Sequence, residues 1–480
     1  MVPSAHHREF TELPITLDRS SGQPLSEQIA AALREAINAQ TLRADEPVPA
    51  SREFAARLKV ARGVVVAAYS QLITEGYLTA QHGRGTRVHP ELSPMHLGAP
   101  TTHNPIEKGT SPEISDDQQL KPLAPGSPDT FDVNTPAWRS AWRSALNRAH
   151  LEAPFLGDLR LREQIAEHLR RMRATQRNVS DVIVTAGARD ALSLLLVTLS
   201  GSLKRKPVVG VEDPGYASLR SVAEAHGSPI VPLAVDEHGI VTHSLPERGL
   251  DLIIITPSHQ YPLGASLPLS RRRELLDWAL RTGAVIVEDD YDSELRHSGS
   301  PLPALAALDD AHDGSVVLLG SFSKTVTPAL AAGFLLAPAR LREQIEPVRQ
   351  KLGGQVSAVV QAALAEYLAS GEHRRHVAKM RRRYARRREL VVEHLYGPPG
   401  VRVLPMSGGL HAVVELIGAG GATEQRLTKA TSHLGAVALS TYWQGTPNAF
   451  GLVVGTGGNA TEAEFVAALK ELKHLLNDLS

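Results

Sequence analysis

The stretch Gly320-Ser321-Phe322-Ser323-Lys324-Thr325 decides how the longer part of this chain is interpreted. It follows the apolar run 315–319, which is typical of a buried strand, and a second apolar run stands at 334–336. Lysine usually extends its ammonium group to water, so a lysine directly after a buried strand has two explanations. Lys324 is either a surface-loop residue or a partly desolvated amine that forms a Schiff base with an aldehyde, while serine hydroxyls bind a phosphate. Pyridoxal phosphate (PLP) carries both groups.

The composition limits the classes of protein to which the chain can belong. Its 480 residues are too many for one core and predict two or three domains. Lys plus Arg equals Asp plus Glu, at 51 each, so a nucleic-acid contact requires a local basic patch. The lack of cysteine excludes disulfides, thiolate metal sites and a cysteine nucleophile. Residues 1–10 have no apolar core like that of a signal peptide, and the longest apolar runs are strand-sized, so we expect a soluble cytoplasmic protein without a membrane span.

Residues 25–88 begin with the pattern of three helices. Apolar residues recur every four positions from Leu25 to Ile37, as on one helix face. A second helix is expected to begin at Ser51, with this serine as its N-cap, and a third to run from Arg62 to Glu75. The inward face of the third helix is expected to carry Val65, Tyr69, Leu72 and Ile73.

Two short strands, 77–80 and 86–88, follow the third helix. Three helices and a hairpin in this order predict a mainly α winged helix-turn-helix over residues 1–89, whose third helix fits the major groove of DNA. The alternative is a three-helix protein-interaction module with scattered surface arginines.

This segment resembles the GntR family of bacterial regulators. The resemblance is carried by Pro49-Ala-Ser-Arg-Glu-Phe-Ala, Val60-Ala-Arg and Tyr69-Ser-Gln-Leu-Ile-Thr-Glu-Gly-Tyr-Leu. It implies contacts to double-stranded DNA from the following residues: Ser51, Arg52, Ala61, Arg62, Gly63, His82, Gly83, Arg84 and Thr86. The family usually has a hydroxyl residue before the recognition arginine and a polar residue after it. Here they are Ala61 and Gly63, so we expect thin direct base readout and a larger share of backbone contacts.

Residues 90–129 are rich in Pro, Ser, Thr and Asp, without a sustained apolar period, and predict a mobile linker. Residues 130–480 alternate helical patterns with short apolar runs, which predicts an α/β domain with a mostly parallel sheet and helices on both faces. A smaller C-terminal α+β subdomain is expected from about residue 340. The expected strands are 182–185, 208–211, 252–255, 284–287, 316–319 and 334–336.

Polar motifs follow five of these strands, where ligands of such sheets collect. A glycine turn at 185–190 opens a helix, a weak signal for phosphate binding. Tyr216 follows the second strand and is either a surface tyrosine or a ring that stacks on a flat ligand. Acidic residues at 288–292 follow the fourth strand. They lack a His or further carboxylate at ligand spacing, so we expect no metal there, whereas a carboxylate also suits a pyridinium nitrogen.

The order of these motifs resembles the fold-type-I aminotransferases, and the whole chain is similar to the MocR/GabR family of regulators. The resemblance implies that Lys324 forms the Schiff base with PLP, Asp289 holds the pyridine nitrogen, Tyr291 lies near the phenolic oxygen and Tyr216 stacks on the ring. It implies four phosphate ligands, Gly187, Ala188, Ser321 and Ser323, and places two residues near the ring, His259 and Tyr261.

Two departures from the family bear on function. Ala331 stands where the family usually has a phosphate-binding arginine, and Arg189 is the candidate to supply the lost cation. The stretch 450–455 lacks the late arginine with which aminotransferases clamp a substrate carboxylate, so ordinary transamination is not expected.

We therefore expect a PLP-dependent transcriptional regulator that senses an amine, an amino acid or PLP itself. A homodimer would carry two DNA-binding heads and target two half-sites or direct repeats. One alternative is an active aminotransferase with an accessory DNA-binding head. The other is a scaffold that no longer binds PLP.

Overall fold

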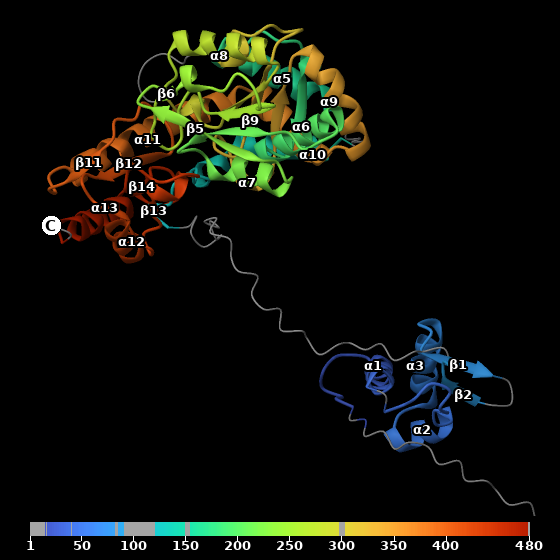
Figure 1. Cartoon of the computed structure of the whole chain (residues 1–480). Coiled ribbons are helices and arrows are strands. Elements are labelled where there is room, and N and C mark those ends of the chain that lie inside the picture. The colour runs from blue at the N-terminus through green and yellow to red at the C-terminus, as the bar shows by residue number, and fades with distance from the viewer. Residues whose placement is uncertain are drawn as a thin grey trace, which may run out of the picture. The chain divides into compact units, whose positions relative to one another are not determined.

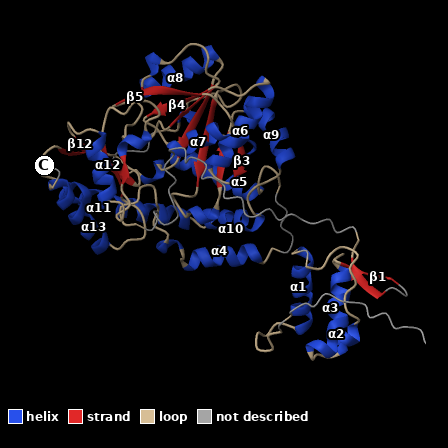
Figure 2. Ribbon diagram, turned by 60° about the horizontal axis from the view of Figure 1, so that its bottom comes forward, coloured by secondary structure: helices blue, strands red, loops and turns tan. Residues whose placement is uncertain are grey.

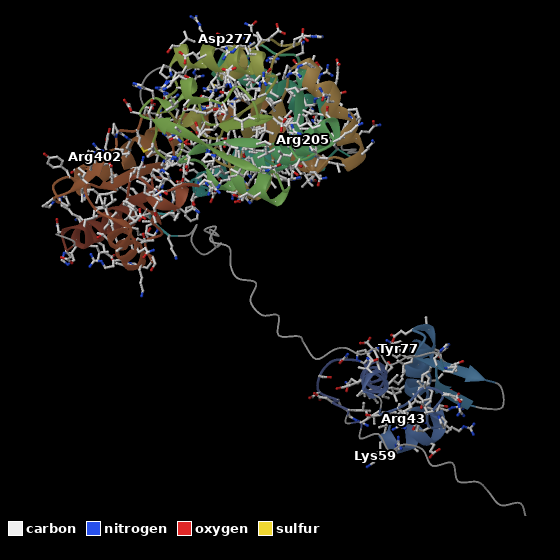
Figure 3. The ribbon with its side chains drawn as sticks, viewed as in Figure 1. Arg43, Lys59, Tyr77, Arg205, Asp277 and Arg402 are labelled. Atoms are coloured by element: carbon white, nitrogen blue, oxygen red, sulfur yellow. The ribbon has the colours of Figure 1, made fainter. Side chains whose placement is uncertain are left out.

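The computed structural model describes residues 15, 17–39, 41–81, 85–90, 121–148, 154–296 and 303–478. The chain divides into two compact units, Met1–Lys108 and Gly109–Ser480 (Figure 1). Charged side chains such as Lys59 in the first unit, and Arg205 and Arg402 in the second, are exposed (Figure 3). Within the described residues, every helix is too short or too polar to cross a bilayer.

The first unit has the predicted winged-helix order. Three helices, α1 (Leu25–Asn38), α2 (Ser51–Leu58) and α3 (Arg62–Thr74), precede the antiparallel strands β1 (Leu78–Gln81) and β2 (Gly85–Val88). One buried face of each helix meets in a common core that includes Ile29, Leu33, Phe54, Val65 and Leu72. The apolar spacing in the sequence therefore predicted these helices correctly.

Two local predictions in this unit are wrong. Ser51 is the first residue of α2, while Ala50 occupies the N-cap position without a side-chain cap. The Ser51 hydroxyl instead accepts a hydrogen bond of 3.3 Å from Arg62 Nε. Ile73 is 39% exposed rather than inward-facing, because it lies about 100° around the helix from Leu72.

The second unit is built on an eight-stranded sheet. The strand order is β3 (Val182–Thr185), β10 (Gly333–Leu336), β9 (Val316–Ser321), β8 (Val285–Asp290), β7 (Leu252–Ile255), β4 (Val209–Asp213), β5 (Ile230–Asp236) and β6 (Gly239–Ile240). The strands from β9 to β5 are parallel, whereas β10 and β6 run antiparallel to their neighbours. The mostly parallel sheet is confirmed. Strands β5 and β6 were not expected, because Pro232 interrupts the apolar run 230–235 of β5 and β6 has only two residues.

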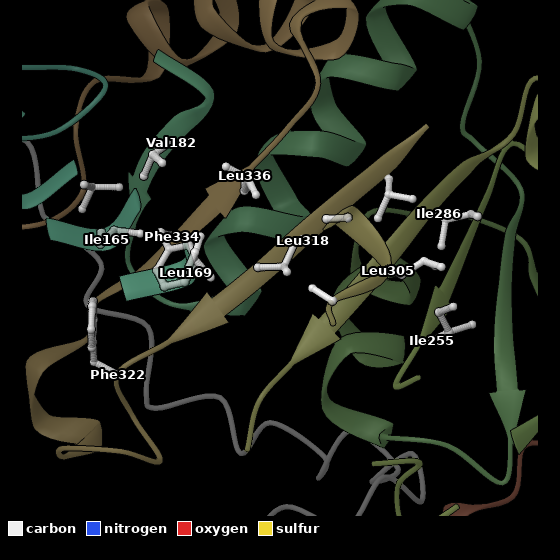
Figure 4. Packing of buried hydrophobic residues seen from close by; sticks show 14 of the residues in the cluster. Ile165, Leu169, Val182, Ile255, Ile286, Leu305, Leu318, Phe322, Phe334 and Leu336 are labelled. Carbon is white, nitrogen blue, oxygen red and sulfur yellow. The ribbon is translucent and has the colours of Figure 1, made fainter. Parts of the chain in front are cut away.

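Helices cover both faces of this sheet (Figure 2). One face packs against α6 (Ala188–Leu203), α7 (Ala217–Ala225) and α9 (Ala339–Leu352). The other packs against α5 (Leu159–Arg173), α8 (Leu269–Thr282) and α10 (Ala358–Ala369), with α4 (Pro136–Leu146) beside α10. Neighbouring strand residues alternate between the two cores, and Figure 4 shows Ile255, Ile286, Leu318 and Phe334 in one of them.

A smaller α+β subdomain completes the second unit. Its antiparallel sheet has the order β11 (Val401–Val403), β12 (His411–Leu416), β14 (Gly451–Gly455) and β13 (Val437–Ala438). Three helices pack with it: α11 (Glu372–Leu395), α12 (Gly421–Ala430) and α13 (Glu462–Asn477). The expected boundary near residue 340 differs from the structure, because α9 and α10 bury Leu341 and Leu364 against the large sheet. After residue 340, the small core first includes residues of α11.

The end of the expected linker, 121–129, is part of the second unit. Leu123 is fully buried in the small core, and its amide donates to Leu434 O at 2.8 Å. Farther along, the Tyr384 hydroxyl accepts from the amide of Asp129 at 2.9 Å. The rest of the expected linker, apart from His89 and Pro90, lies outside the described residues. The low apolar content of 90–129 hid this short docked segment.

Gly320, the first residue of the stretch 320–325, allows a prediction about the packing of the sheet. A Cβ at this position would overlap the Phe334 ring on the neighbouring strand. Gly320→Ala should therefore destabilise the second unit by about 1–3 kcal/mol. Urea unfolding followed by tryptophan fluorescence measures this, because all four tryptophans lie in the second unit.

Gly201 provides the matched control. It is exposed within α6, and a Cβ there would meet no atom within 4 Å. Gly201→Ala should stabilise the unit by roughly 0.5–1 kcal/mol, because alanine has the higher helix propensity. Equal effects of the two substitutions would contradict the packing at Gly320.

Candidate functional site

The turn before α6 and the end of β9 meet at one corner of the sheet. Gly333 pairs with both Thr185 and Ser321, and a Cβ on Gly333 would lie 2.8 Å from the Gly187 Cα. Gly187 has φ of 93°, and no atom lies within 4 Å of the position of a Cβ there. This open space faces the first turn of a long helix, where backbone N–H groups attract anions. Gly187, Ala188 and Ser321 are therefore brought together as expected for phosphate ligands.

Lys324 lies just beyond this corner. Phe322 is buried against Phe334, with ring centroids 6.1 Å apart, and anchors the loop that carries the lysine. The half-buried Lys324 donates from Nζ to Gly126 O at 2.5 Å. The amide of Ser323 donates to Ser321 Oγ at 3.1 Å and tightens the turn. The amine thus sits on a fixed loop, held by one backbone carbonyl.

Asp289 is a buried carboxylate without a hydrogen-bond partner at Oδ2. Burial raises its pKa to about 8, helped by the carboxylates of Asp290 and Asp292 and opposed by the Lys324 ammonium. Such an acid is costly to ionise in isolation and is stabilised by an adjacent cation. Its position at the end of β8 fits the partner of a protonated ring nitrogen.

A hollow of about 300 Å³, open to solvent, lies against Asp289 and Tyr216. It is lined by Val211, Glu212, Gly215, Tyr216, Arg220, Ile254, Thr256 and Asp289. The Tyr216 ring is nearly parallel to that of Tyr291, with an angle of 12° and centroids 6.4 Å apart. An aromatic wall and a buried acid in one hollow suit a flat, cationic heterocycle. Lys324 does not line this hollow.

His259, Tyr261 and Tyr291 form the neighbouring wall. The Tyr291 hydroxyl lies 3.1 Å from His259 Nδ1 and donates to His259 O at 3.0 Å. His259 Nδ1 is also 3.0 Å from Asp292 Oδ2. Burial raises the pKa of both tyrosines well above the usual value, so their phenols stay protonated. Tyr291 therefore contacts His259, Tyr261 and Tyr216, and Tyr261 also contacts Tyr216.

Arg189 and Ala331 are both exposed. Arg189 stands on the first turn of α6 and donates from Nε to Ser218 Oγ at 2.6 Å. Ala331 has φ of 42° just before β10. Arg189 is thus one residue from Ala188 in the corner, although no contact ties its guanidinium to Ser321 or Lys324.

Some residues of the site were not found from the sequence. Gly126 holds Lys324 but lay in the expected linker, with no signal to mark it. The Tyr442 hydroxyl lies 3.1 Å from that of Tyr261. Burial lowers the pKa of His411, beside Tyr261, to about 4. Both lie more than 100 residues along the chain from Tyr261, so only the fold reveals the contact.

A second buried cluster joins His168, Glu294 and His373, whose possible ligand atoms lie within 4.8 Å of one another. His168 Nε2 is 2.7 Å from Glu294 Oε1. Burial opposes the charge on Glu294, but the charge and hydrogen bond of His168 outweigh it and hold the pKa of Glu294 near 2. A metal ion at this cluster would have to displace the proton of His168, and its positive charge would be repelled by the Arg173 guanidinium, which acts on the same carboxylate. The cluster is best explained as an internal ion pair.

In the first unit, the predicted DNA contacts gather where α2 and α3 begin. Arg52, Ala61, Arg62 and Gly63 are all exposed, and the Ser51–Arg62 hydrogen bond ties the two helix starts together. Thr86 is half-buried in β2, and its carbonyl accepts from the amide of Val48 at 3.1 Å. His82, Gly83 and Arg84 lie outside the described residues.

Known proteins share both parts of this architecture. The aminotransferase class I and II family model matches residues 122–464, and that of the bacterial regulatory proteins of the gntR family matches 25–88. The HTH-type pyridoxine biosynthesis transcriptional regulator PdxR of Corynebacterium glutamicum is 42% identical over 456 residues, or 94% of this chain and 96% of that protein. The probable rhizopine catabolism regulatory protein MocR of Rhizobium meliloti is 32% identical over 79% of this chain and 78% of its own.

Solved structures resemble the second unit. An archaeal alanine:glyoxylate aminotransferase superposes with a TM-score of 0.67 at 22% identity, over 75% of this chain and 91% of that one. At this identity, the likeness concerns the fold alone.

Proposed function

The chain belongs to the MocR/GabR family of HTH-type transcriptional regulators, which join a GntR domain to an aminotransferase class I and II domain, and from this membership we propose that it binds PLP around Lys324 and regulates transcription in response to PLP. The observation that carries the proposal is Asp289. Its buried, unpartnered carboxylate lies against an aromatic wall and within the electrostatic reach of Lys324. A cationic ring nitrogen would stabilise the ionised form of this acid, which burial otherwise disfavours.

The residues present fit PLP. Lys324 would hold the aldehyde carbon, Asp289 the ring nitrogen, and Tyr216 one face of the ring, with Tyr291, His259 and Tyr261 at its edge. Gly187, Ala188, Ser321 and Ser323 would hold the phosphate through backbone N–H groups and hydroxyls. When bound, PLP supplies an electron-withdrawing ring that is covalently attached to the protein. The protein's own contribution is to orient the ring, to keep the tyrosines protonated and to hold the Lys324 loop in place.

The sequence of strand β14, near the end of the chain, favours sensing over transamination. Strand β14 carries no arginine, so the bidentate clamp for a substrate carboxylate is missing from this position. The relative from Corynebacterium glutamicum is named for pyridoxine biosynthesis, which supports PLP as the effector and vitamin B6 genes as targets. An amine or amino acid that competes with Lys324 is the second candidate effector. If the purified protein transaminated common amino acids with multiple turnovers, an active aminotransferase would instead be favoured.

A homodimer is proposed as the working form, with two GntR domains of residues 1–89 on two half-sites or direct repeats of one operator in the cytoplasm. The apolar face of α4 packs on α10, and the support for a partner is the leucine at the end of α4, Leu146, which is 66% exposed. Light scattering of the purified protein tests the mass, and footprinting tests the number of half-sites. A monomer that protects a single site would reject this part of the proposal.

Arg189 gives a test of the phosphate end. If its guanidinium replaces the arginine missing at position 331, Arg189→Ala should weaken PLP binding about tenfold or more, as expected for the loss of a charge-assisted hydrogen bond. Adding Ala331→Arg to this variant should restore the affinity. Arg273→Ala, which removes an exposed arginine of α8, is the control. Absorbance titration with PLP measures all four proteins, and wild-type affinity in Arg189→Ala would reject this role.

A further inference from the structure

The exposed face of α3 is almost entirely uncharged. Seven residues of this helix are exposed: Arg62, Gly63, Val66, Ala67, Ser70, Ile73 and Thr74. The opposite face packs into the core through Val65, Ala68, Tyr69 and Leu72. Arg62, the first residue of α3, is the only charged residue in this helix, which ends at Thr74. The helix that the GntR family model identifies as part of a DNA-binding head therefore offers few polar side chains to a DNA groove.

Val66 is the large apolar residue near the start of this face. It is 42% exposed, although valine is usually buried. Val66 lies one turn after Arg62, so the two side chains stand on the same side of the helix. At Gly63, no atom lies within 4 Å of the position of a Cβ, and a partner can approach the backbone there. An apolar side chain thus lies one turn beyond a cation and an open stretch of backbone.

The major groove presents one apolar group, the C5-methyl of thymine; the other base-edge groups there are hydrogen-bond donors and acceptors. A valine cannot satisfy these polar edges, but it can pack on a methyl group. Recognition helices of winged and related heads contact bases with their N-terminal residues, and Val66 lies in the second turn of α3. The Ser51–Arg62 hydrogen bond holds the neighbouring arginine at the start of α2, where Arg52 is also exposed.

We propose that Val66 reads a thymine methyl group in each half-site of the operator, so that this regulator distinguishes its sequence partly by apolar contact. The inference rests on the proposed DNA-binding function and specifies its chemistry. Arg52 and Arg62 then supply the positioning contacts, to phosphates or to a guanine edge.

Replacing thymine with deoxyuridine tests this proposal, because the change removes the methyl group and leaves the Watson–Crick edge intact. The full chain first selects its operator from a random duplex library. Single thymines of that duplex are then replaced in turn, and the Kd is measured by fluorescence anisotropy at fixed salt. One position in each half-site should lose about fourfold in affinity, the expected effect of one buried methyl group.

Protein variants assign the contact. In Val66→Ala, the same uracil substitution should change the Kd little, because the methyl group has lost its partner. Ile73→Ala is the matched control: Ile73 is 39% exposed on the same helix, but two turns farther from its start. It should keep the full uracil effect. Circular dichroism verifies that both variants are folded.

Three outcomes would overturn the inference in different ways. Uracil substitutions without effect at every position of a selectively bound duplex would reject methyl readout and leave DNA binding intact. An undiminished uracil effect in Val66→Ala would assign the methyl contact to another residue. If the full chain selected no sequence from the library, the proposed function would be rejected, and the inference that rests on it would be rejected too.

Discussion

Lys324→Arg is expected to abolish covalent attachment of PLP and to weaken PLP binding by more than about 100-fold. The guanidinium keeps the positive charge that faces Gly126 O, but it stays protonated and is a poor nucleophile. The substitution therefore separates the loss of covalent chemistry from the loss of charge. Absorbance spectra of the protein with PLP should lose the visible band, and borohydride treatment should fix no cofactor to the chain.

Lys206→Arg is the control for this experiment. Lys206 is exposed beyond α6, so its replacement should leave the spectrum and the affinity unchanged. A visible band in Lys324→Arg equal to that of the wild type would mean that another amine holds PLP. The assignment of the whole site would then be wrong, because Asp289 and Tyr216 were placed around this lysine.

Asp289→Asn should remove a pH dependence of the stability of the PLP-free protein. The pKa of Asp289 is raised from 3.8 to about 8 by burial and by the neighbouring carboxylates. Between these two pH values the folded protein holds a proton that the unfolded chain releases, so stability falls as the pH rises. At pH 7 the cost is up to about 4 kcal/mol, from roughly three pKa units at 1.36 kcal/mol each.

The asparagine variant has no such proton to lose. Without PLP it should be more stable than the wild type at pH 7, by an amount that shrinks toward pH 4, and it should bind PLP weakly. Urea unfolding of both proteins from pH 5 to pH 8 measures the difference. Asp277→Asn, on the exposed side of α8, is the matched control (Figure 3). Identical pH slopes for wild type and Asp289→Asn would show that Asp289 has a partner in solution.

The sequence predicted the strands whose ends carry the candidate site. The turns after β3, β4, β7, β8 and β9 were placed by short apolar runs that the parallel sheet buries on both faces. The register of β10 then explains why the turn at Gly187 and the serine at 321 meet. The meeting of Gly187 and Ser321 thus follows from the strand order, which the apolar runs alone did not predict.

Other parts were beyond the sequence for physical reasons. Pro232 inside the apolar run of β5 argued against a strand there. Gly126 and Leu123 dock through backbone groups, which leave no pattern in side-chain types. The small subdomain begins later than expected because α9 and α10 pack on the large sheet, and helical patterns alone do not tell which sheet a helix covers.

In the DNA-binding head, too, the sequence predicted some features and only the structure revealed others. The spacing of Val65, Tyr69 and Leu72 predicted the buried face of α3, whereas the exposed side was judged only by the residues flanking Arg62. The sequence predicted few polar contacts to bases, and the exposure of Val66 adds a specific alternative, an apolar contact to a thymine methyl group. Burial, rather than residue type, distinguished the two valines at 65 and 66.

PLP bound at Lys324 should change how tightly the DNA-binding head holds its operator. The direct measurement is the Kd of the full chain for its selected operator, with and without saturating PLP, for wild type and Lys324→Arg. PLP should change the Kd of the wild type by at least about fivefold, the lower end of usual coupling between sites, and leave that of the variant unchanged. Equal affinities for the wild type in both conditions, with PLP demonstrably bound, would rule out this coupling.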